Sequence, residues 1–263
     1  MTLRDRHNIH VIGDGKTDLI MAHGYGCDQN MWRLVTPAFE KDYRIILYDL
    51  VGSGASDLGA YDKAKYGKLD GHAKDLLAIA AELTRGPAVF VGHSVSAMIG
   101  LLAGIANPGA FATHVMIGPS PCYINDGDYV GGFSRADIES LLDTLDSNYL
   151  GWASAMAPKI MGAPDQPSLG VELTNSFCRT DPDIAKHFAR VTFTSDNRAD
   201  VPKLSEPALL LQCSDDIIAP RSVGEYLHRH LPKSKLVEID NIGHCPHLSA
   251  PQQIIDAMRD FLG

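Results

Sequence analysis

Short apolar runs alternate along the chain with stretches in which apolar residues recur every three or four positions. The runs lie at residues 19–22, 45–48, 89–91, 115–117, 208–212 and 235–239, and the periodic stretches lie at 73–83, 97–105, 223–230 and 252–261. A continuous apolar run is typical of a strand buried on both faces, and a period near 3.6 is typical of a helix with one buried stripe. The alternation predicts an α/β fold with a mostly parallel central sheet flanked by helices.

A gap from residue 123 to residue 201 interrupts this alternation. It holds two helix-start signals, Ser134 with Asp137 three residues later and Asp181 followed by Pro182. We therefore predict a core formed by residues 1–122 and 202–263, with residues 123–201 as a helical cap over the carboxyl ends of the strands, where open α/β sheets bind ligands. The large apolar side chains of the gap either pack the cap helices together or line a pocket: Trp152, Met156, Phe177, Phe188 and Phe193.

Composition excludes several classes of function. The 263 residues include 23 basic and 32 acidic side chains, and the resulting net charge of -9 disfavours nucleic acid as a partner. No apolar run approaches the roughly 18 to 20 residues of a membrane-spanning helix, so no membrane association is expected. The charged residues 1–6 are not followed by the apolar stretch and small-residue cleavage site of a secretory signal.

The cysteines indicate a reduced, cytoplasmic protein without structural zinc. Cys27, Cys122, Cys178, Cys213 and Cys245 are spread along the chain, and no two form a compact metal-ligand spacing. The segment His244-Cys245-Pro246-His247 is rich in potential ligands, but Pro246 interrupts any helix that would align them and no second cluster completes a four-ligand site. No metal and no cofactor are predicted.

A serine stands at a predicted corner between a strand and a helix. The apolar run 89–91 leads into Gly92-His93-Ser94-Val95-Ser96 and then into the helical stretch, which is the context of a nucleophile elbow. The usual pattern is G-x-S-x-G, and Ser96 replaces its second glycine with another small residue. We predict that Ser94 is a nucleophile and that His93 makes a structural hydrogen bond.

A serine hydroxyl needs a base, and the base needs a carboxylate that orients it. Asp216 follows the run 208–212 and His244 follows the run 235–239, which gives the Ser, Asp, His order of α/β-hydrolases. We assign Asp216 and His244 to these roles. Asp215 and His247 remain the alternatives, because they share the same loops.

Attack on a carbonyl creates an oxyanion that needs backbone N–H donors. Two amides follow strands at suitable places: that of Val95, directly after the nucleophile, and that of Tyr25 in His23-Gly24-Tyr25-Gly26. We predict that these two groups form the oxyanion hole.

Two other motifs are rejected. Gly52-Ser53-Gly54 lacks the third glycine of a dinucleotide loop and follows a later strand than the first, so it is interpreted as a turn. Asp49 ends a strand, as the nucleophile of a dehalogenase does, but the elbow holds Ser94 instead of a carboxylate. Dehalogenation and epoxide opening are therefore not expected.

Nearly the whole chain resembles the RsbQ-type bacterial stress-response hydrolases and the related plant strigolactone and karrikin receptor hydrolases. The segments that look like RsbQ are 26–29, 48–54, 119–123, 211–220 and 243–247. The elbow, residues 92–100, looks more like the plant receptors, which also carry serine at the place of Ser96. Tyr25 and Met156 stand where the plant receptors typically have phenylalanine.

The resemblance implies the same triad and oxyanion donors and a V-shaped cap of four helices. It also implies an apolar pocket lined by Phe133, Trp152, Met156, Phe193 and Ile217. We add His93 and Tyr123 to this predicted pocket set.

Two functions are considered. The first is a serine hydrolase that cleaves a small, largely apolar ester or lactone through an acyl-enzyme. The second is a ligand-sensing regulator with slow or single-turnover hydrolysis, which binds a partner protein through its cap; the resemblance to RsbQ implies a stress-response phosphatase with a sensory domain. A binding protein without catalysis is disfavoured, because none of the three triad groups has been replaced.

Overall fold

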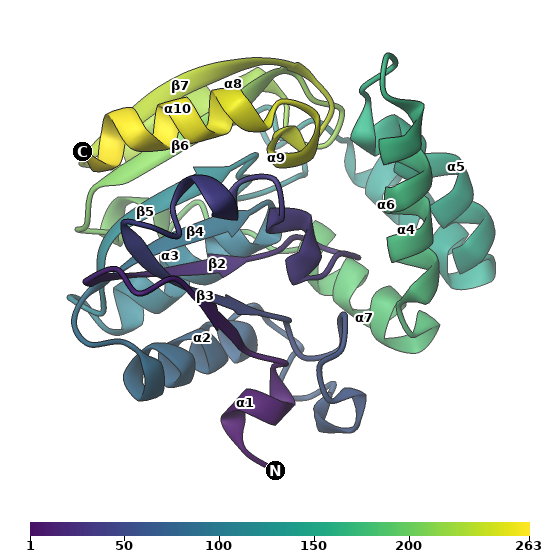
Figure 1. Ribbon diagram of the computed structural model, residues 1–263. Coiled ribbons are helices and arrows are strands. Elements are labelled where there is room, and N and C mark those ends of the chain that lie inside the picture. The colour runs from purple at the N-terminus through teal and green to yellow at the C-terminus, as the bar shows by residue number, and fades with distance from the viewer.

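The computed structural model describes all residues, 1–263, and its centre is one seven-stranded sheet (Figure 1). The strands are β1 His10–Ile12, β2 Thr17–Ala22, β3 Tyr43–Tyr48, β4 Ala88–His93, β5 Phe111–Ile117, β6 Ala208–Asp215 and β7 Ser234–Ile242. Their order is β1-β3-β2-β4-β5-β6-β7, and only β1 runs antiparallel to its neighbour. The predicted mostly parallel α/β sheet is confirmed.

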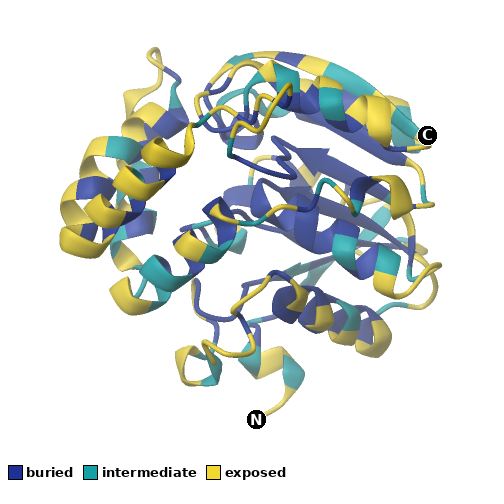
Figure 2. Cartoon of the chain, turned by 180° about the vertical axis from the view of Figure 1, so that it is seen from behind, coloured by how far each residue is buried: buried dark blue, intermediate teal, exposed yellow.

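Alternate residues of the strands enter two separate hydrophobic clusters, one on each face of the sheet. Leu19 and Met21 belong to one cluster, whereas Ile20 and Ala22 belong to the other. This is the two-residue period of a strand, and it makes the run continuously apolar because both faces are covered. In Figure 2 the central strands are accordingly buried, while exposed residues lie on the outer sides of the helices and on the edge strands.

Helices cover both faces of this sheet. The core helices are α1 Leu3–Arg6, α2 Asp70–Leu83, α3 Val95–Ala106, α8 Arg221–His230, α9 Pro246–Ser249 and α10 Pro251–Leu262, and the short 3₁₀ segments are η1 Gln29–Trp32, η2 Thr36–Ala38, η3 Leu58–Ala60 and η4 Val201–Lys203. Buried residues of α2, α3 and α8 share one cluster, and those of α10 and η1 share the other. No helix here combines the length and apolar character needed to cross a bilayer.

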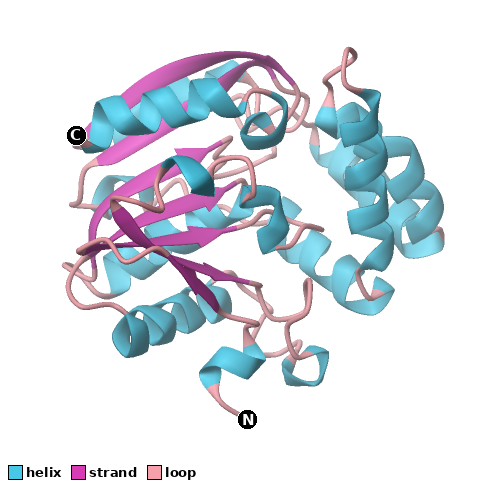
Figure 3. Ribbon diagram, in the orientation of Figure 1, coloured by secondary structure: helices cyan, strands magenta, loops and turns pink.

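Four further helices lie between β5 and β6: α4 Arg135–Ser147, α5 Tyr149–Met161, α6 Pro167–Arg179 and α7 Pro182–Phe193. The side chain of Ser134 accepts a hydrogen bond from the backbone N–H of Asp137, and the side chain of Asp181 accepts from the N–H groups of Asp183 and Ile184, so both predicted helix starts are present. The strand arrows in Figure 3 point toward these helices. The division at residues 123 and 201 places all four helices in the cap.

The strand missing from the prediction is β1. It has three residues, lies at the edge of the sheet, and its side chains are exposed or half-buried. β7 is also a half-exposed edge strand, but its nine residues include the apolar run Leu236, Val237 and Ile239, whereas three residues are too few to show such a pattern.

Candidate active site

The turn between β4 and α3 forces Ser94 into an unusual backbone conformation. Its φ of 56° and ψ of -124° lie outside the regions that non-glycine residues normally occupy, and such strain costs on the order of 1–3 kcal/mol. A Cβ on Gly92 would lie 2.7 Å from the carbonyl carbon and oxygen of Ser96, so glycine is needed where strand and helix meet. The Ser96 hydroxyl donates to the His23 carbonyl and thereby ties the start of α3 to the end of β2.

Three side chains from three strand ends form a hydrogen-bonded line. The Oγ of Ser94 lies 2.7 Å from Nε2 of His244, and Nδ1 of His244 lies 2.6 Å from Oδ2 of Asp216. All three residues are buried. The other Asp216 oxygen accepts from the backbone N–H groups of Ile218 and Ala219, which fixes the carboxylate in place. The structure therefore brings together the three residues predicted as a triad.

The alternative residues have other surroundings. Asp215 has an exposed side chain, and its backbone carbonyl accepts the N–H of Gly243. His247 is fully buried, its ring packs against Trp32 with centroids 4.9 Å apart, and neither ring nitrogen has a hydrogen-bond partner. The structure places neither of them in the line from Ser94.

The loop that carries His244 is attached to the cap. The N–H of His244 donates to the carbonyl of Ile160 near the end of α5, at 2.8 Å. A Cβ on Gly243 would lie 1.9 Å from the carbonyl oxygen of Met161, so the two backbones are in direct contact. Gly243 has a φ of 109°, which favours glycine at this position. The position of the histidine thus depends on both the core and the cap.

The two predicted oxyanion donors flank the serine. Val95 is the first residue of α3, and Tyr25 follows Gly24, where an added Cβ would lie 3.3 Å from Cβ of Ser94. Neither N–H makes a hydrogen bond within the chain. Val95 is in the first turn of a helix, where N–H groups have no intrahelical acceptor, and Tyr25 lies in a turn after β2, so both donors are available to a negatively charged oxygen.

A small apolar cavity of about 30 Å³ adjoins Ser94 and His244. Its other lining residues are Tyr25, Cys27, His93, Tyr123, Trp152, Ile160, Leu173, Phe177, Thr192, Phe193, Ile218 and Cys245. Of the seven predicted pocket residues, His93, Tyr123, Trp152 and Phe193 line it. The cavity lies between the strand ends of the core and helices α5, α6 and α7 of the cap.

Three predicted pocket residues lie elsewhere. Ile217 is 47% exposed and its neighbour Ile218 lines the cavity instead, because the Asp216 side chain holds the next N–H groups in a tight turn that points the two isoleucines in different directions. Phe133 and Met156 are half-buried against the outside of the hydrophobic cluster. The rotation of the cap helices decides which residues reach the cavity, and sequence spacing does not fix that rotation.

Sequence reasoning also missed several lining residues. Leu173 and Thr192 come from cap helices, and Cys27 and Cys245 each stand two residues or fewer from a predicted functional residue. That proximity is the one signal by which the two cysteines were detectable. Burial raises the pKa of the Cys245 thiol well above its usual value, so this thiol stays protonated near neutral pH.

Tyr25 joins the core to the cap. Its ring lies near Trp152, Phe177, Phe188 and Phe193, with centroid distances between 5.8 and 6.4 Å. Its hydroxyl donates to the carbonyl of Ala185 in α7 at 3.0 Å. A phenylalanine would keep the ring contacts and lose this hydrogen bond.

One buried cluster has the side chains of a metal site. A ligand atom from each of His93, Cys245 and His247 lies within 4.8 Å of the others. Burial lowers the pKa of both imidazoles, that of His247 to about 3, so both are neutral. Nε2 of His93 donates to the His244 carbonyl at 2.7 Å, the structural hydrogen bond expected for this residue.

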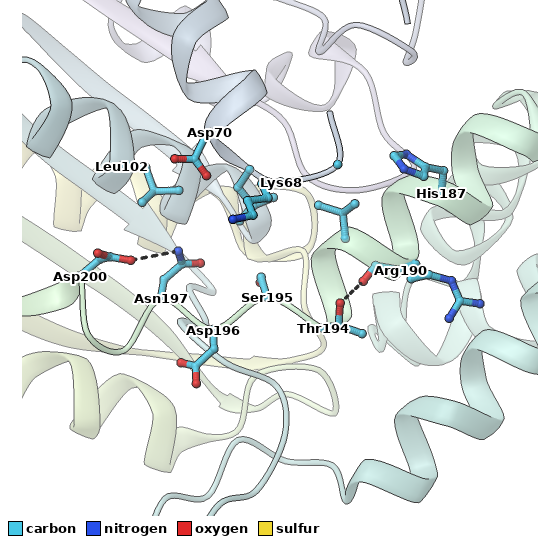
Figure 4. Close-up of a pocket in the computed structure, with 13 residues that line it drawn as sticks. Lys68, Asp70, Leu102, His187, Arg190, Thr194, Ser195, Asp196, Asn197 and Asp200 are labelled. Atoms are coloured by element: carbon cyan, nitrogen blue, oxygen red, sulfur yellow. Dashed lines mark hydrogen bonds between the residues drawn. The ribbon is translucent and has the colours of Figure 1, made fainter. Parts of the chain in front are cut away.

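The largest hollow of the molecule lies away from Ser94. It has a volume of about 640 Å³ and lies between the start of α2 and the end of α7 (Figure 4). Lys68, Asp70, Arg190, Asp196 and Asp200 give it a charged lining, and no triad residue reaches it. Size alone does not mark the candidate site.

Comparison with known proteins places the chain. A model described as the alpha/beta hydrolase family matches residues 19–257. The chain is 39% identical over 256 residues to strigolactone esterase D14 of Arabidopsis thaliana, covering 97% of this chain and 96% of that one. It is 37% identical over 258 residues to karrikin insensitive 2 receptor CA of Petunia hybrida, covering 97% and 95%.

A solved structure is similar over almost its full length. The hydrolase olei00960 from Oleispira antarctica superposes with a TM-score of 0.96 at 42% identity, covering 99% of this chain and 96% of that one. The expected kinship with the plant strigolactone and karrikin hydrolases is confirmed. Since the family model spans most of the sequence and the fold agrees, the chain belongs to the alpha/beta hydrolase family of enzymes.

Proposed function

We propose that the chain is a serine esterase that cleaves a small, largely apolar ester or lactone through an acyl-enzyme. The observation that carries this proposal is the unbroken line of hydrogen bonds from Ser94 through His244 to Asp216. Ser94 is the nucleophile, His244 the general base and then the general acid, and Asp216 the residue that orients the imidazole.

The reaction proceeds in two displacements. Oγ of Ser94 attacks the carbonyl carbon while its proton passes to Nε2 of His244, and the negative oxygen accepts hydrogen bonds from the N–H groups of Tyr25 and Val95. The intermediate collapses, the alcohol leaves with the proton from His244, and an acyl-serine remains. Water then repeats the sequence and releases the acid. In a lactone the leaving hydroxyl stays attached to the acyl group.

The cavity supports the substrate class. Its lining is mainly aromatic and aliphatic, and its volume of about 30 Å³ suits a compact group at the reacting carbonyl. The relative from Arabidopsis thaliana is named a strigolactone esterase, which favours esters and lactones over amides.

The experiment compares the wild-type protein with Ser94→Ala on p-nitrophenyl acetate and on a simple butenolide. We expect turnover by the wild type and a covalent acyl adduct, detected by mass spectrometry on the peptide that contains Ser94. The control is Ser195→Ala, which removes a hydroxyl outside the cavity. An adduct on another residue, or equal rates for wild type and Ser94→Ala, would reject the assignment.

A second candidate is a ligand-sensing regulator, because the relative from Petunia hybrida is named a receptor. In this function the cap surface binds a partner protein, such as the phosphatase with a sensory domain implied by the resemblance to RsbQ. Asp143 and Asp146 lie on α4, but Asp146 pairs with Arg190 of α7 at 2.8 Å and so holds the cap together. Asp143 is exposed, makes no ion pair and is the better position to test.

The test is a pull-down from the native host with wild type and Asp143→Lys. A specific partner that is lost with the variant, while hydrolysis of p-nitrophenyl acetate is retained, supports the regulator. The absence of any specific partner with the wild type rejects it in favour of the plain esterase.

A further inference from the structure

Two hollows of the molecule share one wall. The small cavity at Ser94 is lined by Cys27 and Leu173, and the same two residues line a second hollow of about 210 Å³ on the outer side. Both side chains are almost fully buried, at 5% and 3% exposure. A core residue and a cap residue therefore separate the reactive centre from a space about seven times larger.

The outer hollow lies between η1 of the core and α6 of the cap. Its lining residues are Cys27, Asp28, Asn30, Met31, Arg33, Glu172, Leu173, Ser176, Arg179 and Leu248. Apolar side chains stand next to the wall, and the outer part carries two ion pairs between core and cap: Arg33 with Glu172 at 2.7 Å, and Arg179 with Asp28 at 3.5 Å. The buried part of the lining is thus apolar, and the more exposed part is charged.

Helix α6 is fixed to the core directly after Leu173. The hydroxyl of Ser176 donates to the Gly26 carbonyl at 2.8 Å, and a Cβ on Gly26 would lie 2.4 Å from the Phe177 ring. Gly26 has a φ of 69°, which also favours glycine. Because the helix backbone is held at this point, the width of the passage between the two hollows depends on the side chains of Leu173 and Cys27.

The inner cavity is too small for a complete substrate. Its volume of about 30 Å³ holds one or two water molecules, whereas ligand pockets usually measure some hundreds of Å³. An ester has two arms, and the inner cavity accommodates only the atoms around the carbonyl. The rest of at least one arm needs another space, and the outer hollow is the adjacent one.

We propose that the outer hollow is a subsite for the far part of one arm of the ester, which passes between Cys27 and Leu173. The inference rests on the proposed esterase function and narrows its substrate class. The preferred substrates are esters with an unbranched, medium-length aliphatic arm. Leu173 and Cys27 then determine the arm length that the enzyme accepts.

The test measures the ratio of kcat/KM for long-arm and short-arm esters. One series is p-nitrophenyl acetate, hexanoate and octanoate, which varies the acyl arm; the other is methyl, hexyl and octyl acetate, which varies the alcohol arm. The ratio is kcat/KM for the longest ester of a series divided by kcat/KM for the shortest. In at least one series, Leu173→Trp should lower this ratio by about tenfold or more, because the buried methylenes lose their apolar contacts. Leu173→Ala should raise the same ratio.

Two further variants make the result specific. Cys27→Leu narrows the passage between residues 27 and 173 from the core side and should lower the ratio in the same series. This variant provides the test if Leu173→Trp does not fold. Val171→Trp adds the same side chain at a position of α6 that is 60% exposed and lines neither hollow, and should leave the ratio unchanged.

Two negative results are distinguishable. If the wild type hydrolyses the acetates but the ratios of Leu173→Trp and Cys27→Leu equal those of the wild type in both series, the subsite is rejected and the esterase remains. If the wild type hydrolyses no ester of either series, the proposed function itself is rejected.

Discussion

The strand ends of the core and the helices of the cap contribute to the candidate site in different ways. The core supplies Ser94, Asp216 and His244. Ser94 is held by the tight turn after β4 and Asp216 by two backbone N–H groups, whereas the N–H of His244 donates to the Ile160 carbonyl of the cap. The cap supplies Trp152, Leu173 and other apolar side chains, which are held by packing against other cap residues and against core residues such as Tyr25. The comparison shows that local backbone geometry specifies the chemistry, whereas the relative rotation of whole helices specifies the shape of the pocket.

The sharpest test of the core is Ser94→Ala. This change removes one hydroxyl and should reduce ester turnover by about a millionfold, since the rest of a triad contributes little without its nucleophile. Thermal unfolding should stay within a few degrees of the wild type, because alanine fits the elbow and its strain is unchanged. A stopped-flow assay with p-nitrophenyl acetate and a calorimetric scan measure both effects.

The next test separates two adjacent carboxylates. Asp216→Asn should lower kcat by about ten-thousandfold through a misoriented His244, whereas the matched control Asp215→Asn should change kcat by about threefold or less, because this side chain is exposed. Steady-state kinetics at pH 8 provide the comparison. Losses of similar size in the two variants would contradict the assignment of Asp216.

Acid should destabilise the core through its buried histidines. Burial lowers the pKa of His72 and His247 to about 3 and that of His114 to about 4, whereas an unfolded histidine has a pKa of about 6.5. The unfolded state therefore binds more protons as the pH falls below 6.5, and stability decreases by about 1.4 kcal/mol per pH unit for each such group until its folded pKa is reached. Above pH 6.5 these histidines are neutral in both states, and the folded state keeps its full stability with respect to them.

Urea unfolding of the wild type and His114→Leu at pH 7, 6, 5 and 4.5 tests this dependence. The free energy of unfolding should fall less steeply with pH in the variant, by about 1.4 kcal/mol per pH unit, because one buried histidine is missing. The only cap histidine, His187, is partly exposed, so His187→Gln is the control and should keep most of the wild-type slope. Identical slopes for wild type and His114→Leu would show that this residue is not neutral in the fold.

The smallest expected effect concerns the contact between the two regions. Tyr25→Phe removes the hydrogen bond to Ala185 and should lower the free energy of unfolding by about 1 kcal/mol. With the cap less firmly attached, kcat/KM for a bulky ester such as p-nitrophenyl pivalate should rise a few-fold relative to the acetate.

A matched control exists within the cap. The hydroxyl of Tyr149 donates to the Phe177 carbonyl at 2.7 Å, and both residues belong to cap helices. Tyr149→Phe should therefore cost similar stability without a change in the ratio of pivalate to acetate. A change in the ratio in this variant as well would show that general loosening, and not the contact between core and cap, controls access.

The sequence predicted the core better than it predicted the cap. Six strands were detectable because each carries a run of apolar residues, and the positions of Ser94, Asp216 and His244 follow from their places soon after strands. Ile217 was chosen where Ile218 lines the cavity, an error of one residue that depends on the turn set by the Asp216 side chain. Met156 depends on how helix α5 is rotated, and Phe133 depends on the backbone pairing of its loop with Tyr123 and Asn125; neither has a local sequence signal.

The cluster of His93, Cys245 and His247 illustrates the same limit. Two of its members are close in sequence, but the third belongs to the elbow 150 residues away and arrives there through the order of the strands. Counting ligands within one segment therefore underestimated what the fold brings together. No spacing rule joins residues from different strand ends unless the strand order is already known.

The hydrogen bond from His244 to the Ile160 carbonyl has a consequence for chimeric proteins. A designer who exchanges the cap for that of a relative, in order to change the accepted esters, would naturally replace all of residues 123–201. Such an exchange also replaces the segment on which the histidine loop rests, where Gly162 and Gly243 allow the two backbones to touch. Residues 160–163 belong with the core in any such exchange, although they lie in the middle of the cap sequence.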